Sequence, residues 1–500
     1  MSISAIGSQS ALAVQQLVNM RSQFTDLQRQ ISTGQKSDNY AGLGLDAGMS
    51  VSLNAQLAAL TSYDSSIDIA STRINLMSTA LGQMTDISSS VKAAIAQANS
   101  TADGSGAGAA QQTGQSSLDE LLGLLNTQAG DHYLFSGNAS DQPAVETMDH
   151  ILNGDGSRAG LEQLISERTQ ADLGSNGLGR LQVTAPTSTS VAVAEDAVSP
   201  FGFKLASASS SLTNATVTGP SGSPASLSVN FTGLPNAGDT VTLRLNLPDG
   251  SSENLTLTAT TTSPPGANQF TIGTTAAATA ANFQSALTTS LGNLAATSLT
   301  AASAVSASND FFNADVNNPP QRVNGPPFAT ATSMTAGTTA NTVVWYTGDA
   351  GSGSARDTAT ARVDPSLVVS YGARANEAAI RTLVQNVATL AAVQITPSTA
   401  NSAGLSAALN QRLTGNLNGT SGGQTLTDIA TAIAGAQTTM SAAKDRHQQT
   451  TATLSDFLQQ ITGVSNEEVG TELLSLQTRM QASMQTTSML YQMSLVNYLK

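Results

Sequence analysis

The chain has 500 residues, a formal net charge of -14 and no cysteine. Without cysteine it forms no disulfide, carries no thiolate nucleophile and offers no cysteine ligand to a metal. The acidic balance argues against nucleic acid and anionic membranes as partners, because both recruit clustered Lys and Arg, and the length suggests roughly three or four domains.

The first predicted element is a long helix. Apolar residues recur in alternating three- and four-residue steps, and Gly34 then provides a natural stop. One helix cannot bury so narrow a stripe alone, so the pattern predicts a partner helix or a polymer. The stripe residues assigned to an assembly interface are Ile3, Ile6, Ala13, Leu17, Met20, Phe24, Leu27 and Ile31.

Residues 34–48 predict a loop that joins two helices, because four glycines interrupt the apolar pattern. Their spacing fits neither a dinucleotide-binding loop nor a P-loop, which favours a flexible loop over a phosphate site. A second stripe from Met49 to Ile95 predicts a helix of about 70 Å at 1.5 Å per residue. The Gly- and Ala-rich residues 101–114 are expected to break it, and helix resumes from Leu118 to about Ala129.

The middle of the chain is expected to be rich in strands. Tyr133, Leu134 and Phe135 predict a short strand before a turn at Ser136 and Gly137. From residue 200 to 340 Thr, Ser, Ala and Gly dominate, and alternating residues before and after a Pro-Asp-Gly turn at 248–250 predict a hairpin. A β insertion is therefore expected there, with partial disorder as the alternative because such segments build weak cores.

The last third returns to helices after further strand patterning. Strands are expected at 343–347 and 367–371, a helix at 376–393, and a long helix at 429–464. Ser465, followed by Glu467 and Glu468, predicts the capped start of a final helix. Its stripe completes the proposed assembly interface with Val469, Leu473, Leu476, Met480, Leu495 and Tyr498.

These elements predict an α+β protein. Its long terminal helices are expected to form a coiled-coil or helical-bundle core, with a β-rich outer region inserted mid-chain. Residues 1–45 and 465–500 would form a terminal assembly domain. Residues 46–199 and 341–464 would form a helical bundle with short strands, and residues 200–340 a surface-exposed, Thr/Ser-rich β insertion.

Sites for chemistry are not apparent in the sequence. His132, His150 and His447 lie far apart, and no nucleophile with a base, or pair of carboxylates, can be assigned. No run approaches the roughly 20 apolar residues that cross a bilayer, and no basic, apolar leader opens the chain. No catalysis, cofactor or metal is expected, and these features alone favour a cytoplasmic protein.

The end of the first helix and the following loop resemble bacterial flagellins and their hook-associated relatives. The resemblance rests on Gln30 to Leu43, QISTGQKSDNYAGL, where a helix ends in a Ser-Thr-Gly turn before a polar loop. The continuation through Ile67 and Ile74 is similar as well. In all, the resemblance covers about residues 1–130 and 426–500.

Two branches of this family fit the chain. Asp131 to Gly137, DHYLFSG, resembles an element of the hook-filament junction proteins (hook-associated protein 3), whose shared residues are Tyr133, Leu134, Phe135, Ser136 and Gly137. Met493 to Leu499, MSLVNYL, resembles the ending of the same proteins. These two features favour the junction branch. Filament flagellin is the alternative, because the length and the Thr-rich insertion suit an exposed filament domain.

The resemblance implies an extracellular structural subunit of the bacterial flagellum that serves motility. Such subunits leave the cell unfolded through the flagellar type III export channel, without cleavage, and a type III export chaperone is an implied partner. Their terminal helices order into a coiled-coil tube on assembly. The other implied partners are identical subunits and neighbouring hook-associated protein and flagellin subunits, with no nucleic acid and no membrane insertion.

A secreted coiled-coil adhesin is the alternative outside the flagellum. It would share the Thr-rich strands but would not need paired terminal helices. A coiled-coil receptor would need a membrane span or a signalling domain, and a secreted enzyme would need a catalytic constellation. The sequence offers none of these.

Overall fold

The computed structural model describes residues 2–99, 106–396, 401–419 and 423–498. The fold is α+β, as predicted, with long helices toward both ends and a β-rich region between them. The chain divides into two compact units. Unit 1 comprises Met1–Ile69, Ala361–Val369 and Thr438–Lys500, and unit 2 comprises Ala70–Thr360 and Ser370–Gln437.

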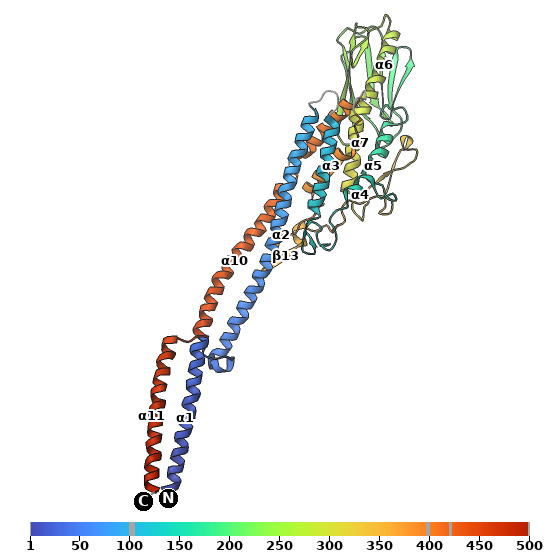
Figure 1. The fold of residues 1–500 in the computed structure, drawn as a ribbon. Coiled ribbons are helices and arrows are strands. Elements are labelled where there is room, and N and C mark those ends of the chain that lie inside the picture. Colours follow the sequence, from blue (N-terminus) through green and yellow to red (C-terminus); the bar gives the residue numbers. More distant parts are fainter. Residues whose placement is uncertain (1, 100–105, 397–400, 420–422, 499–500) are drawn as a thin grey trace. The chain divides into compact units, whose positions relative to one another are not determined.

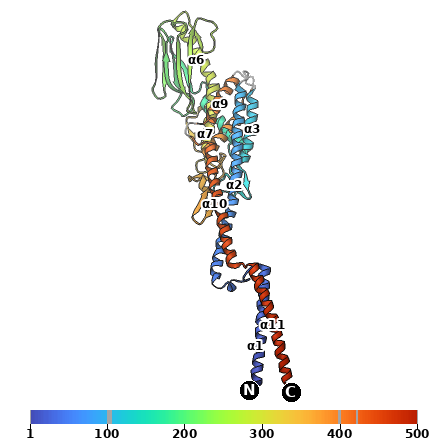
Figure 2. The ribbon, with the colours of Figure 1, turned by 90° about the vertical axis from the view of Figure 1, so that its left-hand side faces the viewer.

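Unit 1 is built from long helices. Figures 1 and 2 both show α1 (Ser2–Thr33) and α11 (Asn466–Tyr498) side by side and antiparallel, with the N- and C-terminal ends at the same end of the pair. The unit also holds the first part of α2 (Ala47–Asn99) and the last part of α10 (Leu426–Thr462). Both are uninterrupted helices, as their apolar stripes predicted.

Backbone hydrogen bonds join the segments that follow α1 and α10. Gly34 takes φ +68°, a left-handed conformation that ends a helix at little cost. The Lys36 N–H donates to the Thr462 carbonyl at 2.7 Å, and the Val464 N–H donates to the Gly34 carbonyl at 3.1 Å. Arg29 holds the loop that follows α1 by pairing with Asp26 and Asp38 at 2.6 and 2.8 Å.

The predicted start of α11 is confirmed. The Ser465 hydroxyl accepts from the Glu468 N–H at 3.3 Å, and Glu467 and Glu468 occupy the first turn. The side-chain oxygen pairs one of the four N–H groups that the first turn leaves unpaired, and the two acids complement the helix dipole. The 3₁₀ helix η1 (Tyr40–Asp46), which lies within the segment expected to be a loop, is capped in the same way by Asn39, which accepts from the Gly42 N–H at 2.9 Å.

Unit 2 contains a bundle of mostly shorter helices. α3 packs against α8, and α7 packs against α5, α8 and α9. Gly114 on α3 explains the first close approach, because a Cβ there would lie 3.2 Å from the Ala391 backbone nitrogen. The bounds of these helices are α3 (Gly106–Leu125), α4 (Met148–Asn153), α5 (Leu161–Leu173), α7 (Thr300–Asn313), α8 (Ala378–Ala392) and α9 (Ser402–Leu417).

Two four-stranded sheets form the β-rich part of unit 2. One has the order β3-β4-β7-β6 and is antiparallel; the other has the order β10-β9-β8-β5 and is antiparallel except for β10 beside β9. The strands are β3 (Leu181–Thr187), β4 (Ser190–Glu195), β5 (Lys204–Ser210), β6 (Ala215–Ser221), β7 (Ser226–Phe231), β8 (Thr240–Asn246), β9 (Ser252–Thr260) and β10 (Gln269–Thr271).

The predicted hairpin is β8 and β9. Val241 lies opposite Leu257, and Leu243 lies opposite Leu255, so the alternating apolar residues share one buried face. Helix α6 (Ala276–Leu294) contacts strands of both sheets. Its Phe283 meets Phe231 and Phe270 edge to face, with ring centroids 5.6 and 5.2 Å apart.

Helix α6 offers a test of its capping residue. Thr275 accepts from the Ala278 N–H at 3.1 Å, so Thr275→Ala is expected to lower the free energy of unfolding of the β-rich part by about 1 kcal/mol. Urea denaturation followed by circular dichroism measures the change. Thr261→Ala, at an exposed loop position, is the control and should change stability by less than about 0.5 kcal/mol; equal effects would contradict the role of the cap.

Several sequence-based boundaries differ from the structure. The two four-stranded sheets begin with β3 at Leu181, ahead of the predicted insertion at residue 200, and α6 and α7 lie within the segment expected to be β. Helix α3 already begins at Gly106 and ends at Leu125, because close packing on α8 outweighs the weak helix propensity of glycine. Residues 101–105 of the expected break lie outside the described part. The three predicted domains stay a prediction.

The strand expected at residues 343–347 is wrong. Val343, Trp345 and Tyr346 are all at most 1% exposed, so side chains on both sides of the segment are buried. It belongs to none of the sheets of the described residues; Tyr346 forms an isolated bridge with Val145, and the Val343 N–H donates to the Ala159 carbonyl at 3.0 Å. The later strands are β13 (Thr360–Asp364) and β14 (Leu367–Ser370), and the strand expected at 133–135 is β2 (His132–Tyr133), paired with β1 (Gln128–Ala129).

Candidate assembly interface

The apolar stripes of α1 and α11 face each other within the chain. On α1 the half-buried side chains recur at four- and three-residue steps, and α11 supplies a matching row. A seam with this period is typical of two helices that pack at a small angle. Its members include the predicted interface residues Ala13, Leu17, Met20, Phe24, Leu27, Val469, Leu473, Leu476 and Met480.

The seam accounts for one face of each helix and leaves other apolar residues exposed. Val469 and Leu476 are each 5% exposed, whereas Leu474 is 65% exposed on the same helix. On α1, Leu12 is 65% exposed and Val18 is 57% exposed. At about 100° per residue, Leu12 and Val18 flank the seam on opposite sides. Exposed apolar groups beside a paired seam are candidates for contact with further helices.

Five predicted interface residues need separate mention. The structure does not describe the side chains of four of them: Ile3, Ile6, Leu495 and Tyr498. Ile31 lies at the end of α1 and is 39% exposed. The role of the whole set in contacts between subunits stays a prediction. The sequence stripe alone did not point to the exposed residues, because they interrupt rather than extend the regular three-four pattern.

The family-like motif at residues 133–137 lies in unit 2. Phe135 is 0% exposed, and Ser136 forms an isolated bridge with Arg374 and donates its hydroxyl to the Gln142 carbonyl at 2.8 Å. Gly137 takes φ +65°, and a Cβ there would lie 3.1 Å from Arg374 Cγ, so this position requires glycine. Leu134 is 8% exposed. The motif therefore fixes a tight turn against the Arg374 side chain.

Two of the three histidines bond side chains close to them. His132 bonds Ser140 at 2.9 Å, and His150 bonds Glu146 at 3.0 Å. Within the described residues there is no group of three or more His, Asp or Glu side chains that could hold a metal. Gly44 takes φ +58° inside η1, and no strand precedes it, so the structure gives this glycine-rich segment no phosphate-loop geometry.

One of the three histidines is buried in unit 1. His447 on α10 is 3% exposed; its Nδ1 lies 2.6 Å from Asp64, and its Nε2 lies 3.6 Å from Asp364 on β13. Lys444 pairs with Asp68 on the same face, and this hydrogen bond raises the pKa of Lys444. Only the fold brings together residues 64, 364 and 447, so no local sequence pattern marks the cluster.

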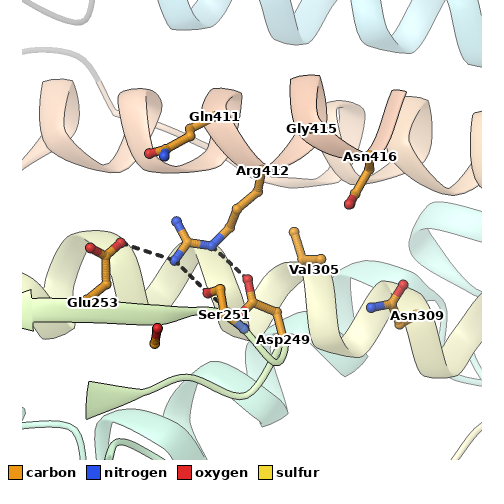
Figure 3. Close-up of a pocket in the computed structure, with 10 residues that line it drawn as sticks. Asp249, Ser251, Glu253, Val305, Asn309, Gln411, Arg412, Gly415 and Asn416 are labelled. Atoms are coloured by element: carbon orange, nitrogen blue, oxygen red, sulfur yellow. Dashed lines mark hydrogen bonds and ion pairs between the residues drawn. The ribbon is translucent and has the colours of Figure 1, made fainter. Parts of the chain in front are cut away.

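One cavity of about 350 Å³ in unit 2 is lined by an ion pair between Arg412 and Asp249. Figure 3 shows Arg412 of α9 reaching the turn between β8 and β9, where its Nε lies 2.8 Å from Asp249. Arg412 also approaches Ser251 at 3.4 Å and Glu253 at 3.6 Å, and its Nη1 donates to the Ala408 carbonyl at 2.9 Å. Since its donors are engaged within the chain, this arginine fixes the hairpin to α9.

No helix among the described residues is long and apolar enough to cross a membrane. Residues 6–140 match the family model for the bacterial flagellin N-terminal helical region. This match spans α2, α3, most of α1 and the family-like motif, which is 135 of the 500 residues. No curated protein matches the chain.

Helix α1 of the candidate assembly interface lies almost entirely within the matched region.

Proposed function

We propose that this protein is the junction subunit between the flagellar hook and the filament. The observation that carries the proposal is the resemblance of Asp131 to Gly137 to the corresponding element of junction proteins. The ending MSLVNYL supports it from the other end of the chain. The protein would adapt the hook to the filament by contacting a hook-associated protein on one side and flagellin on the other.

Polymerisation would use the terminal helices. The pair of α1 and α11 buries one seam, and its exposed apolar residues would pack against the pairs of neighbouring subunits. Contacts that join unlike surfaces of identical subunits generate rings or open helical arrays. Few charges oppose such contacts, because only 11% of the residues are charged.

Export would precede assembly. The protein would leave the cell unfolded through the flagellar type III route, with an export chaperone that covers the terminal helices. Helices that depend on a partner to bury their stripe are poorly stable alone. This dependence is compatible with a chain that passes through a narrow channel before it folds.

The location of the protein on isolated flagella tests the proposal. Antibody raised against the β-rich residues 181–271 should label one point at the hook end. A flagellum that lacks the protein should show no label and serves as control. Label along the whole filament would overturn the junction assignment and establish the filament subunit instead.

Filament flagellin is the second candidate. The two sheets between residues 181 and 271 favour it, because they form a β-rich part with many exposed Thr and Ser side chains, as suits an outer filament domain. Purified subunits distinguish the two functions by sedimentation. A filament subunit is expected to form long polymers alone, whereas a junction subunit should need the hook or a neighbouring hook-associated protein.

A further inference from the structure

We propose that a pocket beside the family-like motif binds a carboxylate group. The pocket has a volume of about 240 Å³ and lies entirely in unit 2. Its walls come from α2, from β2 and the turn after it, and from residues 358–360 and 371–373. Tyr133, Leu134 and Gly137 of the motif contribute to the wall.

Arg73 of α2 is the group that gives the pocket its charge. Its one hydrogen bond runs from Nη1 to the Tyr371 hydroxyl at 3.4 Å, and it forms no ion pair within the described part of the chain. Arg168 and Arg180 of the same unit differ, because each pairs with an aspartate at 2.8 Å. Arg73 therefore keeps N–H donors that can bind an anion.

The other polar groups on the wall suit the same ligand. Tyr371 is 3% exposed, so its hydroxyl is held in place beside Arg73. His132 bonds Ser140 at 2.9 Å and lies 3.5 Å from Asp131, and Asn138, which also lines the pocket, donates to Asp349 at 2.8 Å. The wall thus combines one permanent positive charge with hydroxyl, imidazole and amide groups. A carboxylate accepts several hydrogen bonds at once and pairs with arginine through two parallel bonds.

Two sources could supply the carboxylate. The chain has 34 acidic and 20 basic residues, so a second copy presents many Asp and Glu side chains to its neighbours. The other source is a free small organic acid. The first source depends on the proposed assembly, whereas the second can be tested on the subunit alone.

Acetate is the probe for the unassembled subunit. Its binding is followed by the ¹⁵N-¹H resonance of the Arg73 side chain and by calorimetry, with chloride replaced so that ionic strength stays constant. Wild type should bind acetate saturably. Arg73→Met should lose binding by about tenfold or more, because the loss of a charge-assisted bidentate pair removes the main contact. Lys92→Met, which removes the same charge from the same helix outside the pocket, should bind as wild type does.

The second arm measures the critical concentration for assembly of the same variants. If a neighbour's side chain fills the pocket, Arg73→Met should raise this concentration about tenfold, and acetate should do the same to wild type. Arg73→Lys keeps the charge without the paired geometry and should fall between the two. The fluorescence of Trp345, the only tryptophan and 0% exposed, reports whether each variant is folded.

The two arms separate the possible results. A critical concentration that rises both with Arg73→Met and with acetate identifies a neighbour's carboxylate, and acetate binding without any effect on assembly identifies a free acid. Two results together would overturn the pocket proposal. Wild type would fail to bind acetate, and neither Arg73→Met nor added acetate would raise the critical concentration for assembly. Failure of wild type to polymerise would count against self-assembly only, because the acetate titration of the subunit does not depend on it.

Discussion

Removal of α11, by ending the chain after Ser465, is expected to abolish self-assembly while unit 2 stays folded. The deleted residues belong to unit 1, and they carry the half of the seam that covers Leu17 and Phe24 on α1. Without it, α1 loses its partner, and an isolated amphipathic helix is marginal in water. Sedimentation measures the loss of polymer, and Trp345 fluorescence should show unchanged unfolding of unit 2.

Two leucines on α11 form a matched pair that refines this result. Leu476 is 5% exposed in the seam, and Leu474 is 65% exposed on another face. Leu476→Ala should lower the helix content and thermal stability of unit 1. Leu474→Asp should leave both unchanged but weaken assembly, because it would place a charge in the contact with a neighbour. Polymers of normal yield from the truncated chain would contradict the assembly role of the terminal helices.

Asp172→Ala is expected to destabilise unit 2 by about 3–5 kcal/mol, the cost of removing one partner from a buried ion pair. The Asp172 side chain is 0% exposed and lies 2.8 Å from Arg168. It also accepts from the Gly202 N–H at 2.8 Å, while Arg168 lies over the Phe201 ring at 5.1 Å. The substitution leaves a guanidinium and a buried N–H without their acceptor. Urea unfolding followed by Trp345 fluorescence measures the loss.

The pH dependence of this effect has a defined sign. Burial raises the pKa of Asp172, so the folded state binds a proton more readily than the unfolded state does. The contribution of this titration to stability is therefore present at low pH and is lost as pH rises through the raised pKa. The difference between wild type and Asp172→Ala should be at least as large at pH 4 as at pH 7.

Asp119→Ala is the control for the aspartate substitution. Asp119 is exposed on α3, so its loss should change stability by less than about 0.5 kcal/mol. The buried Asp172 carboxylate is costly to desolvate, but removing it alone leaves the Arg168 guanidinium without its ion-pair partner. An equally small effect of Asp172→Ala would show that water replaces Asp172 as a partner of Arg168. It would contradict the structural role of the ion pair.

Periodicity predicted the long helices well, because the apolar pattern that specifies a helix lies in residues close together in the sequence. The stripe at Met49 to Ile95 falls within α2, the stripe at Ile429 to Val464 falls within α10 except for its last two residues, and Ser465 caps α11. A helical face repeats every three or four residues, so its signal accumulates over many turns. The hairpin of β8 and β9 was equally readable, since alternation and a Pro-Asp-Gly turn specify its register.

Predictions were poorer where tertiary packing outweighs local preference. Residues 343–347 have strand-forming side chains, yet burial on both sides makes them a core segment without a ladder. Gly106 to Gly114 favours a break by propensity, yet contact with α8 keeps it helical. Propensities of a few tenths of a kcal/mol per residue are readily overridden by packing.

The sequence by itself determined the α+β class, the long terminal helices and the flagellin resemblance, because each depends on short-range pattern. Only the tertiary structure decided that the stripes of α1 and α11 cover each other and leave residues such as Leu12 and Leu474 exposed. The same is true of the pocket around Arg73, where residues 73 and 371 meet across nearly 300 positions of chain. Contacts at such separation arise from folding and leave no local signal.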